Sequence, residues 1–370
     1  MKTTNQSMDV QPERLKKLLK DLVDIYSPSG KEEEVIEFAY RYLKKHGLKV
    51  TKQEVDEDRF NLIVFPEKRN EVELCLVGHL DTVTAYDLDD YGFHEEGDTV
   101  FGLGTADMKA GCAAMMEAFT ALAGRRGAFP PVGLALVVDE EEDNKGAKTL
   151  VREYSFPWAV VGEPTNMVPC LGHYSYLEIL LRTRGKRAHS AMPELGQNAI
   201  ETMLKLLLKV TEYTMSESQG LVYNIRELSG FPGGFMVPDI CEAWLDLHLP
   251  PNSRIDVLKA EMEQLVAAAS RDITELDAHL SFEDTYSGYQ ISPERPLVRK
   301  LQEVYEKMSL PWETQDFRSH SDGNILWTTG VDPIILGPGR LEAAHTPEEA
   351  APFSQVVQAA HAYLNLALSL

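Results

Sequence analysis

The sequence is poor in cysteine and in positive charge, and it contains no long apolar run. Four cysteines stand far apart in 370 residues without a C-x-x-C pair. This usage excludes a disulfide-stapled fold and predicts buried, reduced thiols. Lysine and arginine total 36 against 58 acidic residues, which gives a net charge of −22. Such a chain repels phosphate backbones and anionic lipid, so we expect neither nucleic-acid binding nor docking to membranes.

Membrane and secretory segments are also missing from the pattern. No apolar stretch approaches the roughly 18 residues that a membrane span needs. The opening residues, MKTTNQSMDVQPER, lack the apolar core of a signal peptide. We therefore expect a cytoplasmic protein. The apolar fraction of 44% and the charged fraction of 25% are typical of globular proteins, and the length suits about two domains.

Helical and strand-like patterns alternate in the first part of the chain. Apolar residues recur at helical spacing over 15–25, 35–43 and 108–123. Between them, VELCLVG, GLALVV and WAVVG are continuously apolar, as strands buried on both faces are. The alternation predicts a layered α/β domain. The same pattern resumes from about residue 293 with a helix, the strand DPIILG and a terminal helix.

A different pattern occupies the middle of the chain. Its order is strand–helix–strand–strand–helix–strand, which predicts a smaller α+β, ferredoxin-like insert. We therefore expect a catalytic domain made of residues 1–171 and 289–370, interrupted by an inserted domain at 172–288.

Polar residues that suit a catalytic site gather where the apolar strands end, and sites in α/β sheets form at strand ends. These residues are His79, Asp81, Asp107, Glu140, Glu141, Glu163 and His345. Taken singly, several have ordinary explanations. His79 suits a structural histidine, Asp107 a helix N-cap, and VVDEEED a solvated charge run.

Together, two imidazoles and three carboxylates form a mixed nitrogen and oxygen ligand set. This set suits two Zn²⁺ ions, with Co²⁺ or Mn²⁺ as substitutes. Two such ions close together polarise a carbonyl and generate a nucleophile from water at neutral pH. Glu140, which is not one of these five candidate ligands, is then free to act as general base.

The ordered motifs resemble those of the dinuclear-zinc amidases of peptidase clan MH. That family holds acetylornithine deacetylase, succinyl-diaminopimelate desuccinylase, aminoacylases and several carboxy- and aminopeptidases. The resemblance covers nearly the whole chain and implies a zinc-exopeptidase-like α/β/α catalytic domain with an inserted lid and dimerisation domain, in a homodimer. The motifs are VGHLDTV, GLGTADMKAGCAA, VVDEEEDNKGAKTL, VGEPT, GKRAHSAMPELGQNAI, SDGN and GPGRLEAAHTPEE.

The resemblance also implies a role for each metal ligand. His79 and Glu163 would bind one zinc ion, Glu141 and His345 the other, and Asp107 would bridge both.

Four further residues receive catalytic or positioning roles from the resemblance. Asp81 would orient His79. Glu140 would take the proton from the metal-bound water and deliver it to the leaving amine. His189, in the insert, would stabilise the oxyanion, often from the partner subunit of a dimer. Asn198 would cap and position the helix that follows it, and it is also a candidate substrate-binding residue.

Two departures from the family pattern put the substrate in doubt. Phe235 stands where many relatives have Asn, and His248 where they have Arg in a strand motif. Those positions help to bind the substrate's α-carboxylate or neighbouring groups. We hypothesise that Arg340 or Arg318 binds the carboxylate instead, because each lies near a site motif. The ordinary alternative for both is a surface arginine.

The sequence thus predicts an amidohydrolase that acts on a small N-acyl amino acid, with N-acetylornithine or a related N-acyl diamino acid as first choice. A di- or tripeptidase or a carboxypeptidase with the same mechanism is the alternative. A non-catalytic protein that binds metal or ligand is a remote third hypothesis.

Overall fold

The computed structural model describes residues 9–66, 70–85, 91–125, 127–216, 220–274 and 276–370. The chain forms two compact units. The large unit comprises Met1–Leu171, Ile291–Phe317 and Ser321–Leu370. The small unit comprises Gly172–Gln290 and Arg318–His320.

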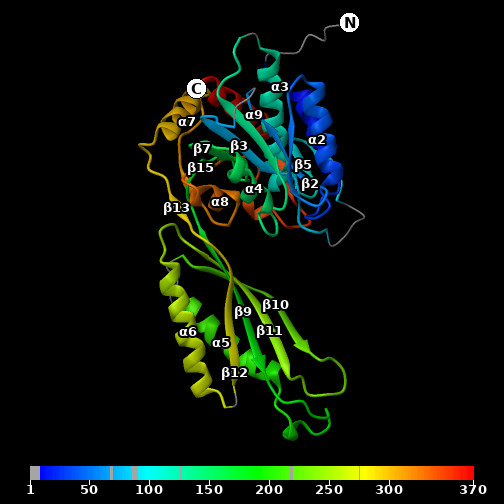
Figure 1. Cartoon of the computed structure of the whole chain (residues 1–370), viewed down its shortest axis with the longest axis vertical. Helices are drawn as coiled ribbons and strands as arrows, with labels where there is room; N and C mark the ends of the chain where they lie inside the picture. The colour runs from blue at the N-terminus through cyan, green and yellow to red at the C-terminus, as the bar shows by residue number, and fades with distance from the viewer. Residues whose placement is uncertain (1–8, 67–69, 86–90, 126, 217–219, 275) are drawn as a thin grey trace. The chain divides into compact units, whose positions relative to one another are not determined.

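The large unit is a mixed α/β structure (Figure 1). Its helices are α1 (Pro12–Val23), α2 (Glu33–Lys45), α3 (Ala110–Gly124), α4 (Lys145–Glu153), α7 (Pro296–Lys307), α8 (Asp322–Thr328) and α9 (Phe353–Leu368), with the short helical segments η2 (Thr105–Lys109) and η4 (Leu341–Ala343). Its strands are β1 (Thr51–Asp56), β2 (Arg59–Val64), β3 (Leu74–His79), β4 (His94–Glu96), β5 (Thr99–Phe101), β6 (Val132–Val137), β7 (Trp158–Val161), the start of β8 (Cys170–His173), β14 (Gln315–Phe317), β15 (Asp332–Ile335) and β16 (Ala350–Pro352).

A large central sheet organises this unit, with the strand order β1-β2-β6-β3-β7-β15-β8. Strands β6, β3, β7 and β15 run parallel to one another, whereas β2 and β8 on either side are antiparallel to them. One face of these strands packs against Leu150 of α4 and Leu326 of α8, while α3 contacts β3 and β6 and packs against α1 and α9. The predicted layered α/β fold with a buried central sheet is confirmed.

The parallel strands place their carboxyl ends along one edge of the sheet. Helix α3 comes very close to this edge, because a Cβ atom on Gly111 would lie 2.2 Å from the backbone oxygen of Gly162. Only glycine fits such an approach. The turns after β3, β6, β7 and β15 are therefore brought together.

The small unit has its own sheet and core. It contains β9 (Ser175–Arg184), η3 (Pro193–Leu195), α5 (Ala199–Ser216), β10 (Val222–Phe231), β11 (Ile240–Leu249), α6 (Ile255–Asp272), β12 (Asp277–Tyr286) and β13 (Tyr289–Gln290). The sheet order is β10-β11-β9-β12, and each pair is antiparallel. Helices α5 and α6 pack on the sheet around a core that includes Leu177, Met203 and Leu245 (Figure 1).

Two further expectations can be compared with this fold. The four cysteines are buried and free, as predicted. Among the described residues, no helix has both the length and the apolar character that crossing a bilayer requires.

Candidate metal centre

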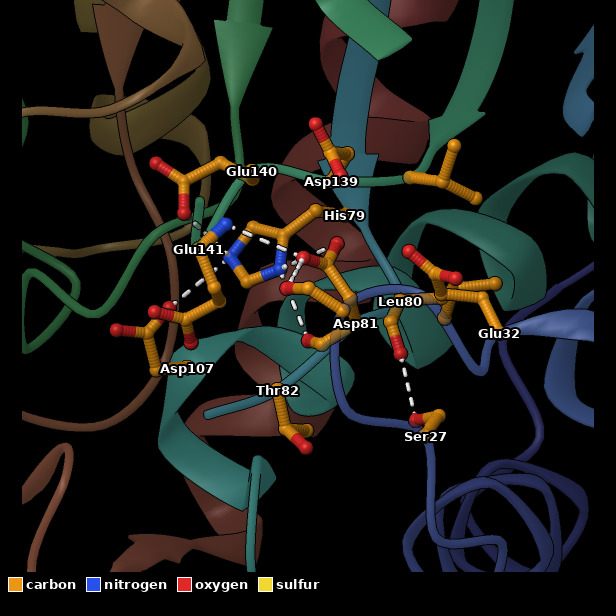
Figure 2. Close-up of polar contacts among 12 residues, drawn as sticks. Ser27, Glu32, His79, Leu80, Asp81, Thr82, Asp107, Asp139, Glu140 and Glu141 are labelled. Atoms are coloured by element: carbon orange, nitrogen blue, oxygen red, sulfur yellow. Dashed lines mark hydrogen bonds and ion pairs between the residues drawn. The ribbon is translucent and has the colours of Figure 1, made fainter. Parts of the chain in front are cut away.

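His79 lies at the carboxyl end of β3, and its ring is held in one orientation. The side chain is fully buried. Its Nδ1 lies 3.1 Å from the backbone oxygen of Asp81 and 3.6 Å from Asp81 Oδ1. A carbonyl oxygen only accepts, so Nδ1 carries the proton in this bond. In the neutral ring the lone pair of Nε2 then faces the carboxylates of Asp107, Glu140 and Glu163. Figure 2 shows the ring between Asp81 and the carboxylates of Asp107 and Glu140.

Asp81 connects the turn of His79 to two other segments. Its Oδ2 accepts a hydrogen bond from the Ser29 hydroxyl at 2.7 Å and another from the backbone N–H of Glu141 at 3.1 Å. One buried carboxylate thus faces the His79 ring and fixes the backbone of Glu141. Ser29 is not among the candidate residues predicted from the sequence.

Asp107 lies between the two candidate histidines. Its Oδ1 is 3.1 Å from His79 Nε2, and its Oδ2 is 3.5 Å from His345 Nε2. Its backbone is extended, with φ −117° and ψ 94°, so α3 begins at Ala110 and not at Met108 as expected. The N-cap of α3 is Lys109, which rules out the simple capping explanation for Asp107.

Glu140 and Glu141 follow β6 and turn toward the same place. Glu141 Oε2 is 3.0 Å from His345 Nε2, and Glu140 Oε2 is 3.7 Å from His79 Nε2. The Glu140 side chain is 6% exposed and that of Glu141 7%. Their burial contradicts the solvated-charge explanation for these two residues, although Glu142 and Asp143 are exposed.

The residue before this pair sets their direction. Asp139 adopts a left-handed backbone with φ +70°, which a non-glycine residue rarely does. Its Oδ1 lies 2.6 Å from Arg59 Nη2 on β2, and its backbone oxygen accepts a hydrogen bond from Asn144 N at 2.6 Å. The same guanidinium also binds the buried carboxylate of Glu32. These contacts hold the turn that carries Glu140 and Glu141.

Glu163 completes the group from the turn after β7. Its Oε1 lies 3.6 Å from His79 Nε2. This buried oxygen makes no hydrogen bond within the described part of the chain. An unpaired buried carboxylate oxygen is costly, and a cation would satisfy it.

The electrostatics of the cluster also favour a cation. Burial raises the pKa of Glu163 to about 8, and the Asp107 carboxylate adds to the rise. Burial also raises the pKa of Glu140 well above its ordinary value, with a further contribution from Glu163. Burial opposes protonation of His79, but the carboxylates of Glu163 and Glu140 outweigh it and raise the pKa of the ring. Bound positive ions would remove this mutual repulsion.

The distances fit metal ligands. Two atoms that each lie about 2.1 Å from one tetrahedral ion are roughly 3.4 Å apart. The imidazole–carboxylate distances of 3.0 to 3.7 Å around His79 and His345 lie close to that value. Within the residues that the structure describes, His79, Asp107 and Glu141 offer ligand atoms that all lie within 4.8 Å of one another. The nitrogen and oxygen donors therefore fit divalent metal ions.

The structure brings together every residue that the sequence suggested around the metals, namely His79, Asp81, Asp107, Glu140, Glu141, Glu163 and His345. Arg340 also lies in the large unit, where it is exposed and forms an isolated bridge with Thr165, two residues after Glu163.

The other predicted residues belong to the small unit. His189 is exposed, and its Nδ1 accepts a hydrogen bond from Ala191 N at 3.1 Å, so the proton of the neutral ring resides on Nε2. Asn198 Oδ1 accepts from Ile200 N at 3.0 Å and caps the start of α5. The Arg318 guanidinium lies 5.9 Å from the centre of the Tyr174 ring.

His248 and Phe235 have contrasting surroundings in the small unit. His248 packs 5.2 Å from the Tyr176 ring, and its buried Nδ1 makes no hydrogen bond within the described residues. Phe235 is 88% exposed on a segment that pairs with the one carrying His189, through a bridge between His189 and Met236.

Fold and site together define an α/β protein with a candidate metal centre at the carboxyl ends of its parallel strands. The model of peptidase family M20/M25/M40 matches residues 75–369. The chain belongs to this family of hydrolases.

The names of similar proteins indicate different activities. An acetylornithine deacetylase of Vibrio atlanticus (strain LGP32) is 27% identical over 337 residues, covering 86% of this chain and 86% of that protein. A probable carboxypeptidase of Aspergillus niger (strain ATCC MYA-4892 / CBS 513.88 / FGSC A1513) is 26% identical over 384 residues, covering 94% and 87%. The crystal structure of a tripeptidase from Staphylococcus aureus has the same fold, with a TM-score of 0.80, 22% identity, and coverage of 96% and 98%.

Proposed function

We propose that this protein is a metal-dependent amidohydrolase that removes the acyl group from a small N-acyl amino acid. N-acetylornithine or a related N-acyl diamino acid is the first choice, supported by the similarity to the Vibrio deacetylase. One observation carries the proposal: Asp107 faces His79 with one oxygen and His345 with the other, while Glu140 lies beside them. This is the set of groups that metal-assisted amide hydrolysis needs.

The ligand assignment is the one that the family resemblance implies, and the distances are compatible with it. His79 and Glu163 would hold one ion, Glu141 and His345 the other, and Asp107 would contribute one oxygen to each. Two Zn²⁺ ions per chain are proposed, with Co²⁺ or Mn²⁺ as substitutes. When bound, these ions supply Lewis acidity, which polarises the scissile carbonyl and makes water a nucleophile at neutral pH.

Glu140 moves the proton in this scheme. Its carboxylate accepts a proton from the attacking water as the new carbon–oxygen bond forms. It then gives that proton to the amine nitrogen as the carbon–nitrogen bond breaks. Burial raises the pKa of Glu140, a direction that favours returning the proton to the leaving amine.

Two other side chains support the same step. Asp81 fixes the His79 ring and the Glu141 backbone and so keeps two ligands in place. His189 would donate its Nε2 proton to the oxygen that becomes negative during attack. In the homodimer suggested by the resemblance, this histidine would act from the partner subunit.

The small unit offers a surface for that homodimer. Strand β10 lies at the edge of the sheet, and an edge strand exposes unpaired backbone groups. Exposed apolar side chains lie along it and along α5, namely Leu204, Leu208, Met215, Val222, Ile225, Leu228 and Phe231. Apolar surface of this kind marks interaction sites. Sedimentation equilibrium of the purified chain tests the proposal, and a monomer at micromolar concentration would contradict it.

A cytoplasmic location is proposed with this function. All four cysteines are buried and unpaired, as thiols in a reducing compartment usually are.

A metallo-exopeptidase is the second candidate function, because the probable carboxypeptidase of Aspergillus niger is 26% identical to this chain over most of its length. It would use the same residues on a peptide bond. A non-catalytic protein that binds metal or ligand is a remote third candidate, since the proposed base and all the proposed ligands are present.

One panel of substrates separates these candidates. N-acetylornithine, N-acetyllysine, N-succinyl-diaminopimelate and several dipeptides are incubated with added zinc or cobalt, with a chelator as control. Chelator-sensitive release of one acyl group supports the amidohydrolase. Cleavage of dipeptides alone supports the exopeptidase. Tight metal binding without any cleavage would contradict the substrates named here and favour either the binding protein or a substrate outside the panel, selected by Phe235 and His248.

A further inference from the structure

The small sheet β16-β5-β4 of the large unit brings Glu349 next to the turn that carries Asp107. Strand β16 begins one residue after Glu349 and pairs antiparallel with β5, with Ala350 opposite Phe101. The backbone oxygen of Glu349 accepts a hydrogen bond from Gly102 N at 3.2 Å. This pairing brings Glu349 against residues 102–107.

The Glu349 carboxylate binds the backbone of this turn with both oxygens. Oε2 accepts a hydrogen bond from Gly104 N at 2.8 Å. Oε1 accepts from Ala106 N at 2.9 Å and from Asp107 N at 3.0 Å. Glu349 is 3% exposed. Three N–H donors around one buried carboxylate form an anion-binding nest of the turn itself.

The turn is shaped for this carboxylate. Gly104 has φ +74°, and a Cβ atom there would lie 2.5 Å from Thr82 Cγ2. A glycine is needed for both reasons. Glu349 thus holds the backbone of the turn up to the N–H of Asp107.

We propose that Glu349 is a positioning residue of the metal centre, which holds Asp107 where its two oxygens face His79 and His345. The inference rests on the metal-binding part of the proposed function. Glu349 follows His345 by four residues, so one short segment supplies a ligand and fixes the shared one. Groups that orient a ligand typically change metal affinity by about 10- to 100-fold when they are removed.

The test compares E349Q with the matched control E348Q. Glu348 is the exposed neighbour in the same segment. In E349Q the amide NH₂ replaces one acceptor and faces backbone donors, so at least one hydrogen bond of the turn is lost. Zinc is titrated into the metal-free proteins in competition with a chromophoric chelator, and the thermal midpoint of each metal-free protein is recorded.

The expected result is a zinc dissociation constant about 10- to 100-fold higher for E349Q than for wild type. The constant for E348Q should stay within twofold. A lower thermal midpoint with wild-type zinc affinity would overturn the inference, because it would mean a role in stability alone. If E349Q does not fold, E349D decides by the same comparison, since it keeps the charge but is too short to reach all three donors.

The titration of the wild type separates this inference from the proposed function. Two zinc ions bound without cleavage of any panel substrate would contradict the proposed substrates and leave the positioning role to be judged by the variants. A wild type that binds no divalent metal would refute both.

Discussion

The two units differ in how they hold their candidate functional residues. In the large unit, His79 and Glu163 are buried and fixed by contacts from several turns. In the small unit, His189 is exposed and its neighbour across the bridge, Met236, follows the almost fully exposed Phe235. A charged cluster needs a dry, preorganised site to bind metal and to shift pKa values, whereas residues that meet a substrate must be accessible. The comparison separates a buried candidate metal centre in the large unit from exposed candidate residues in the small unit.

Metal removal should give the largest effect, because it acts on the buried cluster as a whole. Dialysis against a chelator should abolish hydrolysis, and added zinc should restore it. The metal-free protein should also become less stable as pH rises. The pKa of Glu163 is about 8 in the folded chain, above its ordinary value of 4.5, because of burial and the nearby Asp107. Between these values the folded state binds more protons than the unfolded state, so the contribution of Glu163 to stability is full below about pH 4.5 and is lost as the pH rises toward 8.

Thermal midpoints from pH 5 to pH 9, with and without zinc, measure this dependence. Bound zinc should flatten the curve, since it replaces the protons on the carboxylates. A metal-free protein whose midpoint rises over this range would contradict the predicted charge state of the cluster.

The next largest effect is expected for Glu140→Gln. The amide cannot accept the proton from water, so kcat should fall by about 10² to 10⁴-fold. Zinc content should stay at the wild-type value, because Glu140 is not one of the proposed ligands. Steady-state kinetics and metal analysis of the same preparation test both statements. A kcat near that of the wild type would refute the assignment of the base.

His189→Ala should have a smaller effect and should not alter metal binding. Loss of one donor to a developing oxyanion typically lowers kcat by about 10² to 10³-fold. The substitution removes an exposed side chain, so the thermal midpoint should barely change. Unchanged kcat would mean that the small unit contributes no catalytic donor at this position, and the contrast between the units would lose its functional meaning.

The smallest effect concerns which unit binds the substrate carboxylate. Arg340 lies in the large unit beside Thr165, and Arg318 lies in the small unit against the Tyr174 ring. Replacing the arginine that binds the carboxylate with alanine should raise KM about 10- to 150-fold for a carboxylate-bearing substrate, since a charge-assisted hydrogen bond contributes about 1.5 to 3 kcal/mol. The other alanine variant serves as control. If KM is unchanged for Arg340→Ala, the large unit does not supply this contact.

Much of the fold could be predicted because its signals are local. The continuous apolar segments VELCLVG and GLALVV correspond to strands β3 and β6. The helical spacing over 15–25 corresponds to α1, which ends at Val23. The start of α3 was misplaced at Met108. Asp107 and Met108 depart from helical geometry, and the Asp107 carboxylate faces His79 and His345. Helix propensity does not predict such a departure at a site.

The candidate ligands could also be predicted, because each follows an apolar strand and matches a motif at its own position. The groups that hold them could not. Ser29, Arg59 and Glu349 each act on a turn far away in the chain. Glu349 ends the motif GPGRLEAAHTPEE, but its sequence neighbours do not show which backbone groups it binds.

The sequence by itself determined the α/β class, the order of the elements and the residue types that suit a metal. Hydrophobic periodicity and short motifs depend only on residues that are close together in the chain. Only the tertiary structure decided which of the adjacent residues Glu348 and Glu349 binds the turn that carries Asp107. Glu348 is exposed, whereas Glu349 is buried and binds three backbone N–H groups near residue 107. The physical reason is that burial and hydrogen-bond partners arise from the packing of distant segments, here β16 against β5.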